Sequence, residues 1–358
     1  MSFSFGEKIR LHVFGASHAQ CVGAILEGIP ANLKISEQDI QKELDRRKPG
    51  SSALVSQRKE EDKLQILSGI KNGKTTGSPI VLLIQNKDVD SSAYEKISKI
   101  PRPGHADLSA YLKYGKDFDI RGGSFFSGRM TAAYVMAGAV AKSLLLSREK
   151  TRIIAHVVQI GKVKVEREVS DLEIEKNAYS SEVRCAIPSV SEKMKSEVEK
   201  ARSDGDSVGG IIECRILNLP AGIGDPIFDS IESVVSHAIF SIPAVKGIEF
   251  GSGFRGSFMR GSENNDSFEI RNGKIVSKTN NSGGILGGIS DGMPIFFRAA
   301  MKPTPSIAKK QQTVNLETMK NTEIAMEGRH DPCIAIRAVP VVECMSALAL
   351  ADLLLRKN

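Results

Sequence analysis

The sequence predicts an α+β fold in a single domain that spans residues 1–358. Segments with strand-like alternation come in antiparallel-looking groups rather than in strict turn with helices, which disfavours a doubly wound parallel sheet. No low-complexity linker divides the chain. Residues 121–145 and 328–354 resemble each other weakly, because both place an arginine-bearing loop before an apolar helix. This leaves an internal duplication open, with two buried helices side by side and sheets outside them.

The first third of the chain contains three predicted strands and one helix. The alternation of apolar residues predicts strands over 9–14 and 22–28, joined by the loop "GASHA". Residues 37–47 are amphipathic, follow Ser36, which is a good N-cap, and are stopped by Pro49-Gly50, so they predict a helix. The apolar run 79–85 predicts the third strand.

The rest of the chain contains two further predicted strand segments and three predicted helices. Residues 129–147 are apolar and small on nearly all sides, which predicts a helix inside the domain. Residues 151–165 and 208–218 have the pattern of strands. Asp225 and Pro226 suit the N-cap and the first position of a helix over 225–240. The Ala- and Leu-rich stretch 341–355 predicts a final helix.

Composition and charge indicate a cytoplasmic protein that binds small anions. The net charge is +7, but basic residues recur beside glycines instead of forming a tail, and the sequence has no aromatic-rich basic stretch suited to nucleic acid. Glu7, Lys8 and Arg10 interrupt the N-terminus, so we expect no signal peptide, and no apolar run is long enough for a membrane span. The five scattered cysteines form no C-x-x-C pair and indicate free thiols rather than a zinc site.

Polar loops carry the candidate chemistry, and each also has a purely structural interpretation. Ser17-His18 in "FGASHAQ" could project from a strand edge toward a ligand or form an exposed turn. In "RPGHAD" (102–107), a helix N-terminus would explain Asp107 but neither Arg102 nor His105. The cluster "RRKPG" (46–50) is more commonly a helix C-terminus, where the helix dipole favours cations.

Three further loops are suited to anions. "DIRGGSFFSGRMTA" (119–132) either is a flexible loop or presents backbone N–H groups to an anion at a helix start. The paired glycines of 280–295 allow a flat ligand to approach the backbone closely, and "KPTPS" (302–306) offers a cation and two hydroxyls to a phosphate. The stretch 328–340 groups two arginines, a histidine and an aspartate: Arg329, His330, Asp331 and Arg337.

Other common nucleotide and hydrolase motifs are absent from the sequence. "GSGFRG" (251–256) matches the dinucleotide fingerprint literally, but the polar stretch "SFMRGSENNDSFEI" that follows is not helical, which excludes that site. The sequence contains no P-loop and no nucleophile elbow. The loops together predict a cationic site for a substrate that carries phosphate and carboxylates, with proton transfer as its chemistry.

As a group, these motifs resemble those of the chorismate synthase family. The resemblance runs nearly end to end through "FGASHA", "RPGHAD", "RGG", "IPAVKGIEFGSGF", "GGILGGISDGMPI", "KPTPS" and "GRHDPCIAIRAVPVVE". It implies a 1,4-anti elimination of phosphate from 5-enolpyruvylshikimate 3-phosphate, with reduced FMN required and no net redox change. It also implies a β-α-β sandwich in which antiparallel sheets flank a central helical layer, and a homotetramer. The length leaves no obvious room for a reductase domain, so we expect an external source of electrons for the flavin.

The resemblance assigns roles to single residues of this chain. His18 would protonate the departing phosphate, His105 would donate toward the reduced flavin, and Asp331 would help the flavin accept the substrate's proton. The implied substrate-binding residues are Ser17, Arg47, Arg102, Arg129 and Arg337. The implied flavin-binding residues are Phe125, Phe126, Ser127, Pro243, Ala244, Gly287, Lys302, Pro303, Thr304, Pro305, Ser306 and Arg329.

The chain departs from the family pattern at several positions. Ala16 and Ala19 replace the glutamate and glycine of the usual "FGESHG", Phe125 replaces an arginine, Phe126 replaces a serine, and Ala53 stands where some members carry an arginine. Side-chain contacts at positions 53, 125 and 126 must therefore differ. Two other functions fit some of the features: a basic module that binds RNA would explain the charge, and a flavin oxidoreductase would need a hydride-donor site that the sequence does not reveal.

Overall fold

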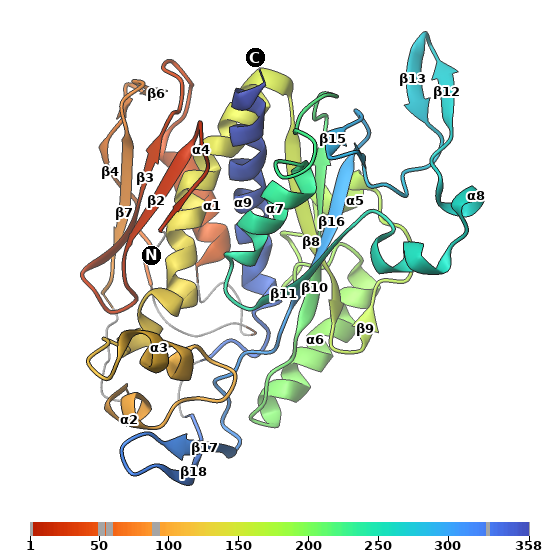
Figure 1. The fold of residues 1–358 in the computed structure, drawn as a ribbon. Coiled ribbons are helices and arrows are strands. Elements are labelled where there is room, and N and C mark those ends of the chain that lie inside the picture. Colours follow the sequence, from red (N-terminus) through yellow and green to blue (C-terminus); the bar gives the residue numbers. More distant parts are fainter. Residues whose placement is uncertain (1–2, 49–53, 55–59, 88–93, 327–329, 358) are drawn as a thin grey trace.

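Two five-stranded antiparallel sheets lie on either side of a layer of helices (Figure 1). The computed structural model describes residues 3–48, 54, 60–87, 94–326 and 330–357. The first sheet has the order β1-β2-β3-β7-β4, with the strands Ser4–Phe5, Arg10–Gly15, Cys21–Glu27, Ile80–Gln85 and Gln65–Ser68. The second has the order β11-β16-β10-β8-β9, with the strands Val245–Phe250, Ile295–Met301, Gly210–Leu217, Arg152–Ile160 and Val163–Lys164. The predicted α+β class with antiparallel strands is confirmed.

The strands form because alternate residues are apolar and face the helical layer. In β7, Ile80, Leu82 and Ile84 are fully buried, while the residues between them are half-buried. In β16, the buried positions are Ile295, Phe297, Ala299 and Met301. One buried face per sheet needs a covering layer, and the helices provide it.

Four helices make up the central layer: α1 (Glu37–Arg47), α4 (Thr131–Glu149), α7 (Ile231–Phe240) and α9 (Ala335–Arg356). Helix α4 packs against β3 and β7, and α9 packs against β8 and β10. The two helices approach closely at Gly138, where an added Cβ would lie 2.2 Å from Cβ of Cys344. Both are long and apolar enough to cross a membrane, but 72% and 94% of their apolar stretches are buried, as in core helices.

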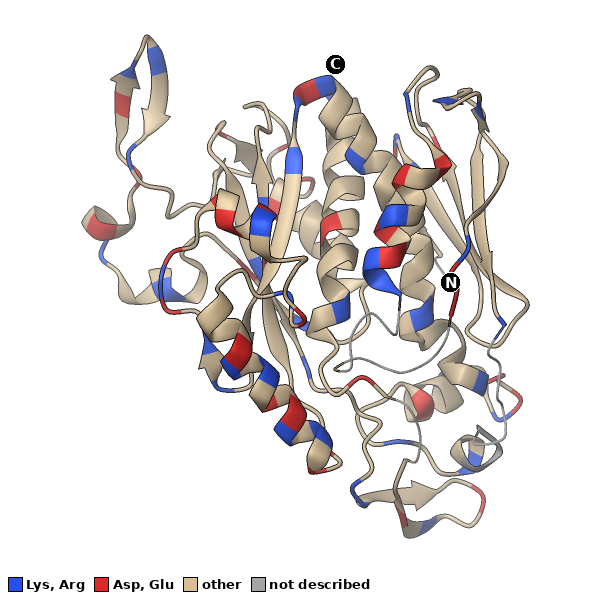
Figure 2. Cartoon of the chain, turned by 180° about the vertical axis from the view of Figure 1, so that it is seen from behind, with Lys and Arg blue, Asp and Glu red and all other residues tan. Residues whose placement is uncertain are grey.

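Further elements surround the three layers. Helices α5 (Asp171–Asn177) and α6 (Pro188–Ser203) lie outside the second sheet, and Figure 2 shows charged residues of both signs along α6. A β12–β13 hairpin (Phe268–Arg271 and Lys274–Ser277) projects from the body. The other elements are β5 (Ile70–Lys71), β6 (Lys74–Thr75), α2 (Tyr94–Lys99), α3 (Asp107–Tyr114), η1 (Arg121–Phe126), η2 (Gly128–Met130), η3 (Gly253–Phe258), α8 (Gly261–Asn264), β14 (Ile285–Leu286), β15 (Ile289–Ser290), β17 (Gln311–Asn315) and β18 (Lys320–Ile324).

Two predicted helix starts need correction. The helix predicted from Asp225 begins at Ile231, because Ile227 has a φ of 72° and the backbone there is not helical. Ser230 is its N-cap and accepts a hydrogen bond from Ser233 N at 3.1 Å. The helix predicted over 341–355 starts earlier, at Ala335. The helix over 37–47 is confirmed, including its Ser36 cap.

Candidate active site

A cavity of about 630 Å³ opens where the N-termini of α4 and α9 meet the loops of both sheets. Its volume lies within the range of small-molecule sites. The predicted substrate and catalytic residues that line it are Arg47, Arg102, His105, Arg129, Asp331 and Arg337. The predicted flavin residues that line it are Phe125, Phe126, Ser127, Pro243, Ala244, Lys302, Thr304, Pro305 and Ser306. Loops far apart in sequence therefore converge on one cationic cavity.

The two central helices add to the positive potential of the cavity. Arg129 lies just before α4, and Arg337 lies in the first turn of α9. Neither helix, both described in full, carries an acidic residue in its first turn. Cations at the positive end of a helix dipole are unfavourable unless an anion is bound there. Asp62 and Asp331, which pair with Arg129 and Arg337, supply negative charge from the protein itself, and the placement is compatible with an anionic ligand as well.

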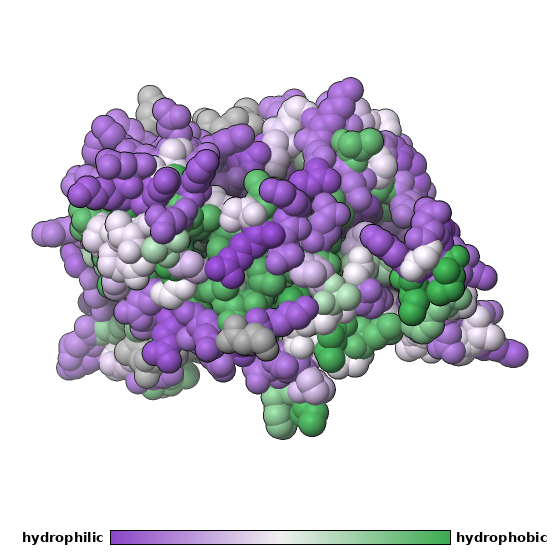
Figure 3. All heavy atoms as spheres, turned by 90° about the horizontal axis from the view of Figure 1, so that it is seen from above, coloured by the Kyte–Doolittle hydropathy of each residue, from purple (hydrophilic) through white to green (hydrophobic). Residues whose placement is uncertain are grey.

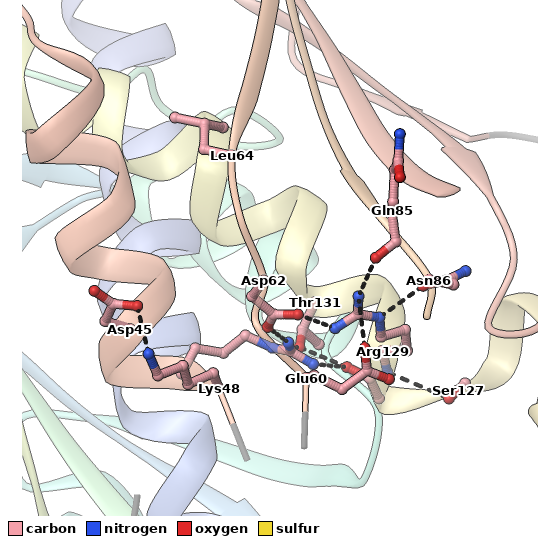
Figure 4. A network of polar contacts seen from close by, with 12 residues as sticks. Asp45, Lys48, Glu60, Asp62, Leu64, Gln85, Asn86, Ser127, Arg129 and Thr131 are labelled. Carbon is pink, nitrogen blue, oxygen red and sulfur yellow. Dashed lines mark hydrogen bonds and ion pairs between the residues drawn. The ribbon is translucent and has the colours of Figure 1, made fainter. Parts of the chain in front are cut away.

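Asp62 joins two of the arginines, Arg47 and Arg129, and Figure 4 shows it beside Arg129. Arg47 Nη1 donates to Asp62 Oδ2 at 2.9 Å, and Arg129 Nη1 forms an ion pair with Asp62 Oδ1. The Asp62 side chain is completely buried, and the Arg47 side chain is 2% exposed. Arg47 Nε also donates to Thr131 Oγ1 at 3.1 Å, and Arg129 Nη2 lies 3.5 Å from Glu60 Oε2.

The charges in this cluster depend on one another. Burial alone would raise the pKa of Asp62, but Arg47 and Arg129 hold it below its usual range. Burial lowers the pKa of the Arg47 guanidinium; Asp62 opposes this fall, and the neighbouring Arg337 and Arg129 add to it. Asp62 therefore makes it possible for two guanidinium groups to lie together at the edge of the cavity.

A second buried carboxylate, Asp107, organises the "RPGHAD" loop. Arg102 donates to it through Nε at 2.7 Å, Nη2 at 2.8 Å and its backbone N at 3.0 Å, and His105 contacts it through Nδ1. Burial would raise the pKa of Asp107, but the hydrogen bonds of Arg102 and His105 hold it well below its usual range. The side chain of Asp107 stands at the start of α3 as expected, yet it binds its own loop.

His18 packs against the lining residue Gly122 and is not itself among the described lining residues. An added Cβ at Gly122 would lie 2.2 Å from Cδ2 of His18 and 2.7 Å from Oγ of Ser17. An added Cβ at Gly123 would lie 3.4 Å from Cε1 of His105. Both glycines have positive φ, of 62° and 80°. The two predicted catalytic histidines therefore pack against consecutive glycines, and Gly122 itself lines the cavity.

The remaining predicted residues divide into those at the cavity and those outside it. Arg337 Nη1 lies 2.6 Å from Asp331 Oδ2, and Thr304 Oγ1 donates to the Asp331 carbonyl at 2.8 Å. Pro303 is not among the described lining residues, and its ring lies near Gly209. Gly287 lies in the exposed turn between β14 and β15 and is likewise absent from the described lining. Ala53 and Arg329 lie outside the described residues.

The lining fits a flavin nucleotide in its chemistry. Phe125 and Phe126, with ring centroids 4.6 Å apart, form an aromatic wall. Pro243 and Ala244 add apolar surface, and the loop 302–306 brings hydroxyl and ammonium groups to the same cavity. A flat apolar ring needs the first kind of surface, and a phosphate needs the second.

Sequence reasoning missed three residues that this geometry makes important. Asp62 and Glu60 contact arginines that are predicted to bind substrate, and Asn86 accepts a hydrogen bond from Arg129 Nε at 2.9 Å. Acidic residues 60–62 directly before a strand were a weak signal, because such charges are usually solvated. Arg129, the partner that all three share, lies at least 43 residues from each of them, so spacing could not reveal them.

Comparison with known proteins identifies the family. A family model described as chorismate synthase matches residues 9–355. The chorismate synthase of Korarchaeum cryptofilum (strain OPF8) is 52% identical over 98% of this chain and 97% of that protein. The chorismate synthase of Dehalococcoides mccartyi (strain ATCC BAA-2100) is 49% identical over 99% and 97%. A solved crystal structure of a chorismate synthase has a TM-score of 0.77 and 33% identity, and the match covers 98% of this chain and 93% of that one. The chain therefore belongs to the chorismate synthase family of shikimate-pathway lyases.

Proposed function

We propose that the cavity binds 5-enolpyruvylshikimate 3-phosphate beside reduced FMN and releases phosphate by a 1,4-anti elimination, which leaves chorismate. The observation that carries this proposal is the convergence of four guanidinium groups and His105 on one cavity, from Arg47, Arg102, Arg129 and Arg337. The substrate has one phosphate and two carboxylates. Guanidinium groups match both kinds of anion with paired hydrogen bonds.

The arginines and Ser17 would hold and orient the substrate. Each of the four arginines contacts a carboxylate, from Asp62, Asp107 or Asp331, which fixes the direction of its remaining N–H groups. Binding energy of this kind is useful only if the anions are held in a reactive geometry. A pre-organised donor of this type contributes roughly 3–4 kcal/mol to a transition state.

The histidines would move protons. The elimination breaks a C–H and a C–O bond on opposite faces of the ring, and the C–O electron pair leaves with the phosphate. His18 would donate a proton to that phosphate from its place against Gly122. His105, held by Asp107, would donate toward the flavin, and Asp331 would assist removal of the substrate's proton. General acid help of this kind contributes about 10²–10⁴-fold.

When bound, reduced FMN supplies an electron-rich ring that promotes phosphate loss and takes up the substrate's proton without net redox change. Phe125, Phe126, Pro243 and Ala244 would contact its ring, with Ser127 close by. The loop 302–306, with Arg329, would bind its phosphate and ribityl chain. Gly287 does not line this cavity, so it would contact a flavin only if that flavin were bound in the cavity of another subunit. An external reductant would keep the flavin reduced.

We also propose a cytoplasmic homotetramer that binds neither nucleic acid nor membrane. Large exposed apolar residues support self-assembly: Phe254, Phe258, Phe268, Ile270 and Ile275 are each more than half exposed. In the view from above, Figure 3 shows apolar side chains on the side that carries the β12–β13 hairpin.

An internal duplication of the sandwich is supported by each sheet lying against one long helix, α4 or α9.

An anaerobic assay tests the reaction. Enzyme, reduced FMN and 5-enolpyruvylshikimate 3-phosphate should release phosphate and chorismate in equal amounts, and oxidised FMN should give none. His18→Ala and His105→Ala should each lower turnover by about 10²-fold or more without unfolding the protein. Failure of the wild-type enzyme to form product would refute the proposal. Stoichiometric consumption of a hydride donor would favour the oxidoreductase alternative instead.

A further inference from the structure

The Asn86 side chain bridges the loop that carries His18 and the arginine Arg129. Asn86 follows directly after β7. Its Oδ1 accepts from Arg129 Nε at 2.9 Å, and its Nδ2 donates to the carbonyls of Ala16 at 3.0 Å and Ala19 at 2.7 Å. Figure 4 shows Asn86 beside Arg129. One amide therefore contacts two parts of the chain, 43 and 67–70 residues away.

The chemistry of these partners determines the orientation of the amide. Arg129 Nε can only donate, and the two carbonyls can only accept. The amide oxygen must therefore face Arg129 and the amide nitrogen must face the loop. Aspartate could replace the first contact but has no donor for the second, and no other uncharged side chain of this size offers both.

The contacts to Ala16 and Ala19 hold both ends of the turn that presents His18. Ala19 N donates to the Ala16 carbonyl at 3.1 Å, which closes the turn around Ser17 and His18. The backbone N of Asn86 adds a hydrogen bond to the Gln20 carbonyl at 3.0 Å. Asn86 thus attaches the turn around Ser17 and His18 to the end of β7, a strand of the first sheet whose alternate residues are buried.

We propose that Asn86 is a positioning residue that fixes the His18 turn relative to Arg129. This inference rests on the proposed function, in which His18 gives a proton to a phosphate on a substrate held by Arg129. A proton donor and a binding group on separate loops keep their spacing only if something joins the loops. A shift of about 1 Å in such a pair is enough to cost about 10²-fold in rate.

Two substitutions separate the two halves of the bridge. Asn86→Asp keeps an acceptor for Arg129 but places a carboxylate against two carbonyls, so the His18 turn is released. We expect kcat to fall at least 10-fold while KM for the substrate stays within about twofold. Asn86→Ala removes both contacts, so kcat should fall similarly and KM should rise as well. Asn72→Asp, in the exposed turn between β5 and β6, is the control for added charge and should behave as wild type.

A double-mutant cycle distinguishes positioning from loss of folded enzyme. If Asn86 acts through His18, Asn86→Asp should cost nothing further in a His18→Ala background. If Asn86→Asp instead reduced the amount of folded enzyme, its fold-loss of activity would multiply with that of His18→Ala, and that result would overturn the inference. A wild-type kcat in Asn86→Asp would overturn it equally.

Amide hydrogen exchange tests the bridge without turnover. In Asn86→Asp, the Ala19 amide should exchange at least 10-fold faster than in wild type, and amides of the second sheet should not change. Unchanged exchange at Ala19 would overturn the positioning role. If the wild-type protein forms no chorismate but the Ala19 amide still exchanges faster in Asn86→Asp, the positioning role stands and the proposed function is refuted. The two failures are therefore distinguishable.

Discussion

Two buried carboxylates organise different groups of cavity residues, and they differ in how far along the chain their partners lie. Asp107 binds Arg102 and His105, which are five and two residues away. Asp62 binds Arg47 and Arg129, which are 15 and 67 residues away. Asp107 therefore organises one loop, whereas Asp62 joins α1, the segment before β4 and the start of α4.

The difference teaches which parts of an active site are also parts of the fold. The Asp107 cluster can form within a loop, with Ser306 as an outside contact at 3.2 Å from Arg102 Nη1. The Asp62 cluster can form only when three elements have packed. Loss of Asp62 should therefore damage stability first, and loss of Asp107 should damage catalysis first.

Asp62→Asn should give the largest loss of stability. Asparagine tolerates the φ of 47° at this position, so the change mainly removes the charge between two buried guanidinium groups. Breaking a buried ion pair by removing one partner costs about 3–5 kcal/mol. Urea unfolding measures the difference in free energy from wild type.

Asp45→Asn is the matched control for that experiment. Asp45 forms an ion pair with Lys48 at 2.9 Å on the same helix as Arg47, but both side chains are more than a third exposed. We expect a loss below about 1 kcal/mol. Equal losses in the two variants would contradict the distinction between a buried joint and a surface pair.

His156 in β8 tests whether a buried titratable group needs a charged partner in direct contact. It is fully buried, its ring nitrogens have no hydrogen-bond partner within the described residues, and Glu213 Oε1 lies 3.9 Å away. Burial lowers the pKa of His156 to about 4; Glu213 opposes this, and Arg215 and Arg298 add to it. In contrast with the carboxylates, His156 should be buried uncharged.

Acid should therefore destabilise the protein through His156. The unfolded chain binds this proton near pH 6.5 and the folded chain only near pH 4, so stability falls as the pH drops between these values. The loss reaches about 3 kcal/mol by pH 4 and is negligible at pH 7. His156→Leu should flatten the profile of unfolding free energy between pH 7 and 4. An unchanged slope in this variant would assign the acid sensitivity to other groups.

Compared with Asp62→Asn, Asp107→Asn should lose less stability and more turnover. The neutral amide still accepts one hydrogen bond from Arg102 but no longer orients His105 as a charged partner. One buried guanidinium loses its charged partner here, against two for Asp62→Asn, so we expect a loss of stability near the lower end of that range, about 3 kcal/mol, and a loss of about 10²-fold in kcat. Unfolding curves and anaerobic turnover, measured on one preparation, give both values. A loss of stability as large as that of Asp62→Asn would break the comparison.

The same difference in reach explains how much the sequence could predict. Some structures depend on contacts between residues that are close in sequence, and these could be predicted. Examples are the helix from Glu37 to Arg47 with its Ser36 cap, and the "RPGHAD" loop. The helix over 225–240 was misplaced because the positive φ of Ile227 depends on surroundings that the local pattern of Asp225-Pro226 does not show.

The candidate site divides in the same way. Arg47, Arg102, Arg129 and Arg337 could be proposed from motifs, and the structure brings them to one cavity. The residues that hold them could not be proposed in the same way. Asp62 and Asn86 have partners across the first sheet and the helical layer, and no periodicity connects such positions. The internal duplication stays a prediction.

Gly122→Ala and Gly123→Ala should give the smallest effects and the sharpest local contrast. Both positions have positive φ, so alanine costs each about 1–2 kcal/mol through backbone strain. They differ in what the new methyl group meets: the His18 ring at 2.2 Å for Gly122, and the His105 ring at 3.4 Å, an ordinary contact, for Gly123. Because the strain is shared, any excess loss of kcat in Gly122→Ala reports displacement of the Ser17-His18 turn, since Ser17 Oγ would also lie 2.7 Å from the new methyl group. We expect that excess to be about 10-fold, or 1.4 kcal/mol in the barrier. Equal turnover in the two variants would mean that displacing the turn around His18 does not lower kcat. That result would also contradict the positioning role of Asn86.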